Sequence, residues 1–357
     1  MTSKNKPDGR LAYLDYLRVL ATVCVIVLHA VYIYFNESDN FARPLWYMIG
    51  YVNEACRAGV PLFFMISGYL MLSREITDIK AFYKKRFLKI AIPFLIYDLF
   101  YFFMGTGNGE GGFSLKGFLS GILYNGNEYH LWFVYSILFL YLLTPFLGKM
   151  VRACSERWLW ILLILATFQT TLRPFVNYLV PGSEFNVLFT SDGFSGYVGY
   201  FILGYVLGTY AESRVLRRVI YAVGTLSFAV VPLVAMNSMI SGTEVFFNGG
   251  YTINHYAEAS AVFLFFKNAN LRRTHFISEL SSVSFNAYLI HVFIVETLRE
   301  APIYVSPWKQ MAIYITVTAV GSFVWGLVLK YGFILVKKLL SLLNPPPGSV
   351  TPDKRLR

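Results

Sequence analysis

Ten apolar segments of about membrane-spanning length constrain this chain more than any other feature of its sequence. A helix needs roughly 20 apolar residues to cross the hydrocarbon core of a bilayer, and only helices and closed barrels satisfy their own backbone hydrogen bonds there. With 56% apolar and 14% charged residues, the chain has far more apolar surface than a soluble domain of 357 residues needs. The sequence therefore predicts an all-α membrane protein, a polytopic bundle of about ten transmembrane helices. The segments are residues 14–35, 46–72, 87–105, 131–148, 158–173, 193–210, 218–241, 255–268, 276–298 and 308–336, of which the fifth and eighth are short.

Lysine and arginine are distributed unevenly over the loops between these segments. With an even number of spans, both tails and every second loop lie on one side, which holds 23 of the 31 Lys and Arg residues, whereas the opposite side holds six. Because positive residues are retained on the cytoplasmic side of a membrane, we expect both termini to be cytoplasmic. The expected organisation is a cytoplasmic tail (1–13), one transmembrane domain (14–336) and a second cytoplasmic tail (337–357).

The net charge of +11 and the three cysteines exclude several classes of function. The basic residues fall in short loops between apolar runs, where they set membrane topology, so we expect the lipid bilayer as a partner and no nucleic acid. The scattered cysteines form neither a disulfide framework nor a CxxC motif. The chain also has no HExxH motif or paired-ligand spacing, so we expect no metal.

The first apolar segment carries two ionisable residues, Arg18 and His29, in the stretch RVLATVCVIVLH. Eleven helical steps of about 100° return the two side chains to within roughly 20° of one face, about 16 Å apart along the axis. Ionisable groups are costly inside a bilayer, so such a pair indicates a functional site. The alternative is structural, with Arg18 reaching the inner headgroups and His29 serving as a hydrogen-bonding residue between helices.

Two more histidines and a glutamate are expected in the outer half of the membrane. His130 opens the fourth span two residues after Glu128, and His291 lies well inside the ninth span. Histidine carries protons near neutral pH, and a carboxylate such as that of Glu128 can orient it as a general base. His255, at the start of the eighth span, is a further candidate.

The loop before the third span, KAFYKKRFLKIAIPF, is strongly basic. Its Arg86 and Lys89 are three residues apart and are therefore neighbours on one helical face. Such a face can hold the phosphates of a cytosolic cofactor. It is also the usual composition of a positive-inside loop, for which anionic lipid is a sufficient partner. The residues alone support both interpretations.

The stretch VPLFFMISGYLML at 60–72 predicts close helix packing. Neither an acidic partner nor nucleophile-elbow glycines surround Ser67, so it is not interpreted as a hydrolytic serine. We expect Ser67 and Gly68 to allow two helices to approach closely.

Five motifs recur in order over roughly residues 10–295. They are LDYLR with Arg-x10-His (Arg18 and His29), FFMISGY after Val60-Pro61, KRFLKIAIPF before the third span, YHLWFVYSILFLYLLTP at 129–145, and SFNAYLIH at 284–291. Singly each is weak, but five in register are specific, and together they resemble the acyltransferase 3 family of integral membrane acyltransferases. HLWF and the absence of an appended SGNH hydrolase-like domain are most similar to the stand-alone O-acetyltransferases of bacterial surface glycans, such as those that act on enterobacterial common antigen or exported poly-N-acetylglucosamine.

The resemblance implies a multi-pass enzyme of the bacterial cytoplasmic (inner) membrane. Such an enzyme moves an acyl group, usually acetyl, from cytosolic acetyl-CoA to a hydroxyl of a glycan acceptor on the outer side. The resemblance also implies that Arg18 and His29 are the essential pair, and it favours roles for Arg86, His130 and His291. Many members have Arg-x-x-Arg where this chain has Arg86-x-x-Lys89, and lysine keeps the charge but loses the bidentate fork.

Our mechanistic hypothesis assigns Arg18, Arg86 and Lys89 to the coenzyme A end of the donor. His29 then either deprotonates the sugar hydroxyl or carries the acyl group briefly, with His130 and Glu128 assisting. Two other functions fit the same residues. One is a glycan exporter, although the chain shows no inverted repeat or matched pair of broken helices. The other is an acyltransferase for a peptide, lipid or small molecule, which shares every motif; the oligomeric state is not predicted.

Overall fold

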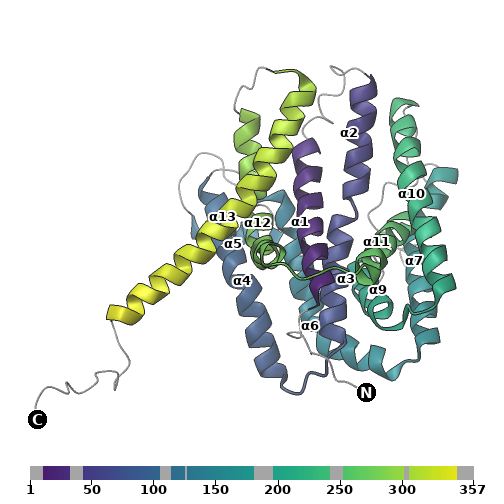
Figure 1. Ribbon diagram of the computed structural model, residues 1–357, viewed down its shortest axis with the longest axis horizontal. Coiled ribbons are helices and arrows are strands. Elements are labelled where there is room, and N and C mark those ends of the chain that lie inside the picture. Colours follow the sequence, from purple (N-terminus) through teal and green to yellow (C-terminus); the bar gives the residue numbers. More distant parts are fainter. Residues whose placement is uncertain are drawn as a thin grey trace, which may run out of the picture.

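The computed structural model describes residues 11–32, 43–104, 114–124, 127–180, 196–241, 252–300 and 305–343. Within these ranges all regular structure is helical (Figure 1). Most of each predicted tail, residues 1–10 and 344–357, lies outside the described residues. The elements are α1 (Ala12–Tyr32), α2 (Arg43–Cys56), α3 (Gly59–Leu72), α4 (Ile79–Phe103), α5 (Leu115–Tyr124), the 3-10 helix η3 (Tyr129–Leu131), α6 (Trp132–Ala153), α7 (Glu156–Leu179), α9 (Tyr197–Tyr210), α10 (Arg214–Ser241), α11 (Ile253–Asn268), α12 (His275–Glu300) and α13 (Pro307–Leu343).

Six helical stretches in the described part of the chain are long and apolar enough to cross a membrane. They are Ala12–Tyr32, Pro44–Leu72, Tyr129–Ala153, Arg214–Asn237, His275–Glu300 and Pro307–Leu343. The prediction of an all-α, multi-pass membrane protein is therefore confirmed. The total of ten spans and the cytoplasmic position of both termini stay predictions.

Every predicted segment coincides with helix, but several boundaries differ. The second segment is two helices, α2 and α3, separated by a turn at Arg57, whose Nε donates to Glu54 Oε1 at 2.9 Å. Helix α4 begins at Ile79, well before the predicted start, because the Asp78 carboxylate caps it by accepting from the Ala81 backbone N–H at 2.9 Å. The basic loop is thus the first part of a helix. Helix α5 lies in a predicted loop, and α13 continues to Leu343.

Helix α1 lies at the centre of the bundle and contacts α2, α3, α11, α12 and α13 (Figure 1). Its residues Leu17, Ala21, Ile26 and Ala30 are fully buried, which places a contact surface along most of its length. The helix that carries Arg18 and His29 is consequently held on several sides.

Helices α3 and α9 pack with their backbones close together. A Cβ atom on Gly68 of α3 would lie 1.8 Å from the carbonyl oxygen of Phe201, and one on Gly204 of α9 would lie 2.0 Å from that of Met65. Both distances are far shorter than van der Waals contact, so only glycine fits at either position. The close approach predicted at Gly68 is confirmed.

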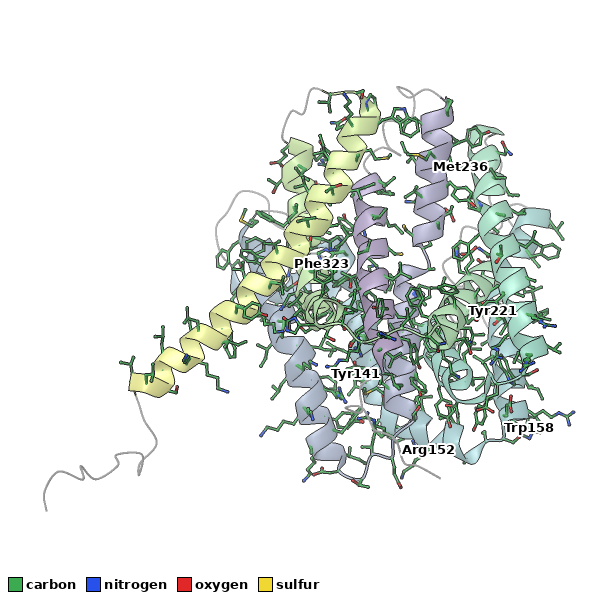
Figure 2. All side chains as sticks on the ribbon, viewed as in Figure 1. Tyr141, Arg152, Trp158, Tyr221, Met236 and Phe323 are labelled. Carbon is green, nitrogen blue, oxygen red and sulfur yellow. The ribbon has the colours of Figure 1, made fainter. Side chains whose placement is uncertain are left out.

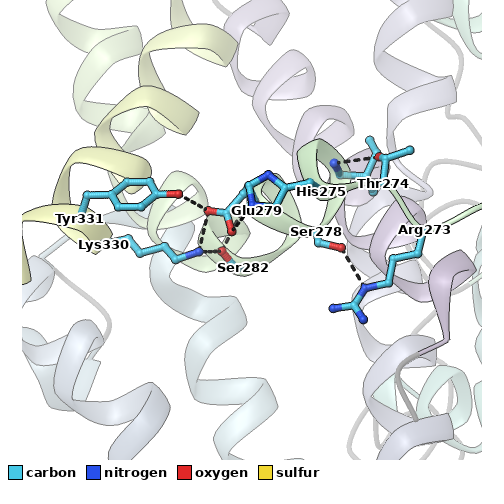
Figure 3. A network of polar contacts seen from close by, with 9 residues as sticks. Arg273, Thr274, His275, Ser278, Glu279, Ser282, Lys330 and Tyr331 are labelled. Atoms are coloured by element: carbon cyan, nitrogen blue, oxygen red, sulfur yellow. Dashed lines mark hydrogen bonds and ion pairs between the residues drawn. The ribbon is translucent and has the colours of Figure 1, made fainter. Parts of the chain in front are cut away.

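A polar network joins α12 to α13 (Figure 3). Lys330 Nζ donates to Glu279 Oε2 at 2.6 Å and to Ser282 Oγ at 3.0 Å, and the Tyr331 hydroxyl donates to Glu279 Oε2 at 2.9 Å. Residues 331–343 are exposed, and this part of α13 extends away from the other helices (Figure 1). The network therefore marks the point where α13 leaves the bundle.

Candidate active site

A cavity of about 610 Å³ lies between α1, α3, α4, α6 and α12. Arg18 of α1 and Arg86 and Lys89 of α4 all line it, so the three cations predicted to hold coenzyme A meet at one place. Arg74, which follows α3, is a fourth cation in the lining and was not singled out from the sequence. Four positive side chains around one cavity favour a ligand that carries several negative charges.

Helix α6 helps to shape this cavity. Tyr141, which is 8% exposed, lines it, and Arg152 lies farther along the same helix (Figure 2). Arg152 Nη1 donates to the carbonyl oxygens of Leu72 at 3.0 Å and Arg74 at 3.1 Å. These bonds fix the end of α3 and the backbone that carries the Arg74 side chain.

Asp15 positions Arg18, and the sequence analysis did not identify it. Its Oδ1 accepts from Arg18 Nη1 at 3.2 Å and from the Ser281 hydroxyl of α12 at 2.7 Å. Asp15 is 1% exposed, whereas the Arg18 side chain is 26% exposed. A buried carboxylate needs such partners, and this one directs a guanidinium to the cavity wall. The available signal was the spacing of three residues between Asp15 and Arg18 in LDYLR.

Three predicted histidines from three elements form one cluster. His29 comes from α1, His130 from η3 and His291 from α12. The ring centroid of His291 lies 4.8 Å from that of His29 and 5.1 Å from that of His130. His130 and His291 are buried, and His29 is half-buried. The structure therefore brings together residues separated by more than a hundred positions in the chain.

The hydrogen bonds of the cluster define which ring nitrogen of His29 is available. His29 Nδ1 lies 2.9 Å from the Val25 carbonyl oxygen and 2.9 Å from His291 Nε2. A carbonyl only accepts, so His29 Nδ1 carries the hydrogen; His291 Nδ1, which donates to the Tyr288 carbonyl, likewise carries its own. His291 Nε2 is then an acceptor for His29. The lone pair of His29 is consequently at Nε2, the nitrogen that can accept a proton as a base or attack a carbonyl as a nucleophile.

The backbone, rather than Glu128, holds the ring of His130. His130 Nε2 lies 3.4 Å from the Leu289 carbonyl oxygen, and its buried Nδ1 has no hydrogen-bond partner among the described residues. Glu128 caps η3, where its Oε1 accepts from the Tyr129 backbone N–H at 3.1 Å. Neither ring nitrogen of His130 is hydrogen-bonded to Glu128, so the expected orientation of the ring by this carboxylate is not found. An assisting role for Glu128 stays a prediction.

Tyr288 connects the cavity to the histidine cluster. It lines the cavity, its ring centroid lies 5.6 Å from those of His130 and of His291, and its hydroxyl donates to the His130 carbonyl oxygen. The cationic cavity and the imidazoles are thus separated by a single buried side chain. The sequence did not indicate this role, since a tyrosine in an apolar span resembles any core aromatic.

Comparison with known proteins decides the family. Residues 11–331 match the model of the acyltransferase 3 family, which is described as an acyltransferase domain. The chain belongs to this family. It is a multi-pass membrane protein, and the resemblance noted from the motifs is confirmed. Its place in the surface-glycan branch stays a prediction.

One curated relative of this chain is an amino-acid racemase of Enterococcus faecalis, 26% identical over 125 residues. The aligned region is 34% of this chain and 16% of that protein, so the chain spans a small part of the relative's length. No solved structure matches the chain.

Proposed function

We propose that this membrane acyltransferase moves an acetyl group from cytosolic acetyl-CoA to a hydroxyl of a cell-surface or exported polysaccharide, in the inner membrane of a bacterium. One observation carries the proposal: a single cavity is lined both by Arg18, Arg86 and Lys89 and by Tyr288, whose ring contacts two histidines of the cluster. The cations that suit a polyphosphate donor therefore lie on one side of Tyr288, and two imidazoles of the cluster lie against its ring.

The cations suit the phosphates of coenzyme A. Arg18 and Arg86 offer planar guanidinium groups that bind phosphate through two parallel hydrogen bonds, whereas Lys89 adds a point charge. Asp15 keeps Arg18 in place by a 3.2 Å ion pair. The coenzyme end is held at the cations, and the thioester end is directed to Tyr288.

The available Nε2 of His29 suits the transfer step. As a base, it removes the proton of the sugar hydroxyl while that oxygen attacks the thioester carbonyl; the carbon–sulfur bond then breaks and the coenzyme A thiolate takes the proton from the imidazolium. As an acyl carrier, the same nitrogen attacks the thioester carbonyl, the carbon–sulfur bond breaks and the coenzyme A thiolate leaves. The sugar hydroxyl then attacks the acyl-imidazole, the carbon–nitrogen bond breaks, and the hydroxyl proton passes to the thiolate. Rapid quenching with labelled acetyl-CoA and no acceptor separates the two routes, because only the second gives a labelled protein.

Purified protein with acetyl-CoA and a panel of oligosaccharides tests the proposal by release of free thiol. We expect release that depends on an oligosaccharide and yields an O-acetylated product by mass spectrometry. Acylation of a lipid or peptide but of no carbohydrate would contradict the proposed acceptor. In cells, deletion of the gene is expected to remove acyl groups from a polymer that is still exported; loss of the polymer itself would indicate an exporter.

A further inference from the structure

A second buried polar cluster lies between α10 and α11, outside the cavity and the histidine cluster. Glu258 Oε2 accepts from His255 Nδ1 at 3.0 Å, and its Oε1 accepts from the Ser227 hydroxyl at 2.5 Å. His255 is 1% exposed and Glu258 is 2% exposed. Because both carboxylate oxygens are engaged, the ring of His255 is held in a single orientation.

This orientation leaves three buried polar atoms without a partner on two consecutive residues. His255 Nε2 and both side-chain atoms of Asn254, Oδ1 and Nδ2, have no hydrogen bond to any residue that the structure describes. Since Nδ1 is paired with Glu258, Nε2 is the ring atom left for a further hydrogen bond. Buried polar groups in proteins are nearly always hydrogen-bonded, so three adjacent exceptions indicate a place where water or a ligand completes the bonding.

The cluster is joined to the histidine cluster through stacked aromatic rings. Tyr256 follows His255 and stacks on Tyr200, with centroids 4.0 Å apart and planes 12° apart, and its hydroxyl donates to the Gly196 carbonyl at 3.3 Å. Tyr197, the residue after Gly196, stacks on Trp132 with ring centroids 5.1 Å apart. Trp132 lies two residues after His130 in the chain. The two polar clusters thus belong to one continuous packed unit.

We propose that Asn254 and His255 form a binding subsite for an uncharged, hydroxyl-bearing carbohydrate, the acceptor of the transfer reaction. The inference rests on the proposed function and names its acceptor site. His255 Nε2 pairs with a sugar hydroxyl, which can both donate and accept, while the Asn254 amide offers one acceptor and one donor, the complement of an acetamido group or of two neighbouring hydroxyls. The residues of the cluster, Ser227, Asn254, His255 and Glu258, include no Lys or Arg, so an anionic ligand is disfavoured there, in contrast to the cationic cavity.

The test is the variant Asn254→Leu in the full-length protein. It keeps the branched skeleton of the side chain and replaces both unpartnered atoms by methyl groups, so no protein hydrogen bond is lost. We expect the KM for an uncharged N-acetylhexosamine oligosaccharide to rise at least about tenfold, the size of one lost hydrogen bond to a bound sugar. The KM for acetyl-CoA should stay unchanged, and the Tm should stay unchanged or rise. Ser260→Ala, a buried residue of the same helix outside the cluster, is the matched control and should change neither KM.

Several results would overturn the inference. An unchanged acceptor KM in Asn254→Leu, or a clear fall in Tm, would mean that the amide only holds α11 in place. The smaller variant Asn254→Ala is measured beside it, and failure of both to fold would have the same meaning. Equal competition by an oligosaccharide of uronic acids would contradict the charge argument. If the wild-type protein acylates no carbohydrate, the proposed function fails first; if it does and the variant matches it, only the subsite fails.

Discussion

His29 is available for chemistry at one nitrogen because the backbone and a second histidine occupy the other. Its Nδ1 lies 2.9 Å from the Val25 carbonyl and 2.9 Å from His291 Nε2. Both contacts fix the ring, so Nε2 does not need to reorient before it reacts.

The variant His29→Ala is therefore expected to lower kcat by about 10²-fold to 10⁴-fold, the usual contribution of a positioned base. Acceptor-dependent thiol release measures it. His275→Ala is the control, because the His275 side chain is 87% exposed and lies at the start of α12. Activity close to wild type in His29→Ala would refute the assigned role.

Asp15 has a separate, measurable effect on the donor. In Asp15→Asn the amide can still bond Ser281, but the ion pair to Arg18 at 3.2 Å is lost. We expect the KM for acetyl-CoA to rise about tenfold while the KM for the acceptor stays constant, since weakening one charge-assisted contact has about this effect. A rise in both KM values would indicate a general disturbance of α1 instead.

The ionisable residues of the site could be predicted from the sequence, whereas their partners could not. Arg18, His29 and His291 stand out because charged or polar groups are costly in an apolar span. Asp15 and Tyr288 do not, because their roles depend on contacts with Ser281 and with the backbone of His130, which are distant in the chain.

At the scale of helices, the close contact between α3 and α9 depends on glycine, which has no side chain, at positions 68 and 204. Gly204→Ala would place a methyl group 2.0 Å from the Met65 carbonyl oxygen, so the helices must separate. We expect a loss of about 1–3 kcal/mol of stability, as in overpacked cores, seen as a lower Tm in detergent.

A matched glycine in α13 provides the control. A Cβ on Gly332 would meet nothing within 4 Å. An alanine in a helix is more favourable than a glycine by about 0.5–1 kcal/mol, so Gly332→Ala should leave the Tm unchanged or raise it. Equal effects of the two substitutions would contradict the packing argument.

The existence of the helices follows from hydropathy, but their ends follow from polar contacts that hydropathy does not detect. The Asp78 cap starts α4 just before the basic stretch, which places Arg86 and Lys89 on a rigid helix beside the cavity. The break between α2 and α3 occurs within one apolar stretch, at the Glu54–Arg57 pair. Hydropathy averaged over a window of residues detects neither the start of α4 nor the break between α2 and α3.

At the scale of the whole molecule, we propose that the donor enters on the side of the cationic cavity and that the acceptor is acylated from the opposite side. The uneven distribution of Lys and Arg predicts that the cavity side is cytoplasmic. The cavity contains Arg18 and Arg86, and Tyr288 separates it from the histidine cluster. Transfer across the membrane then needs no movement of the whole donor.

Proteoliposomes with the protein in one orientation test this claim most directly. Labelled acetyl-CoA is supplied only to the face that carries the cationic cavity, and an oligosaccharide only to the other face. We predict acetylated oligosaccharide on the far side with wild-type protein and none with His29→Ala. Acetylation only when donor and acceptor share one side of the membrane would contradict the account.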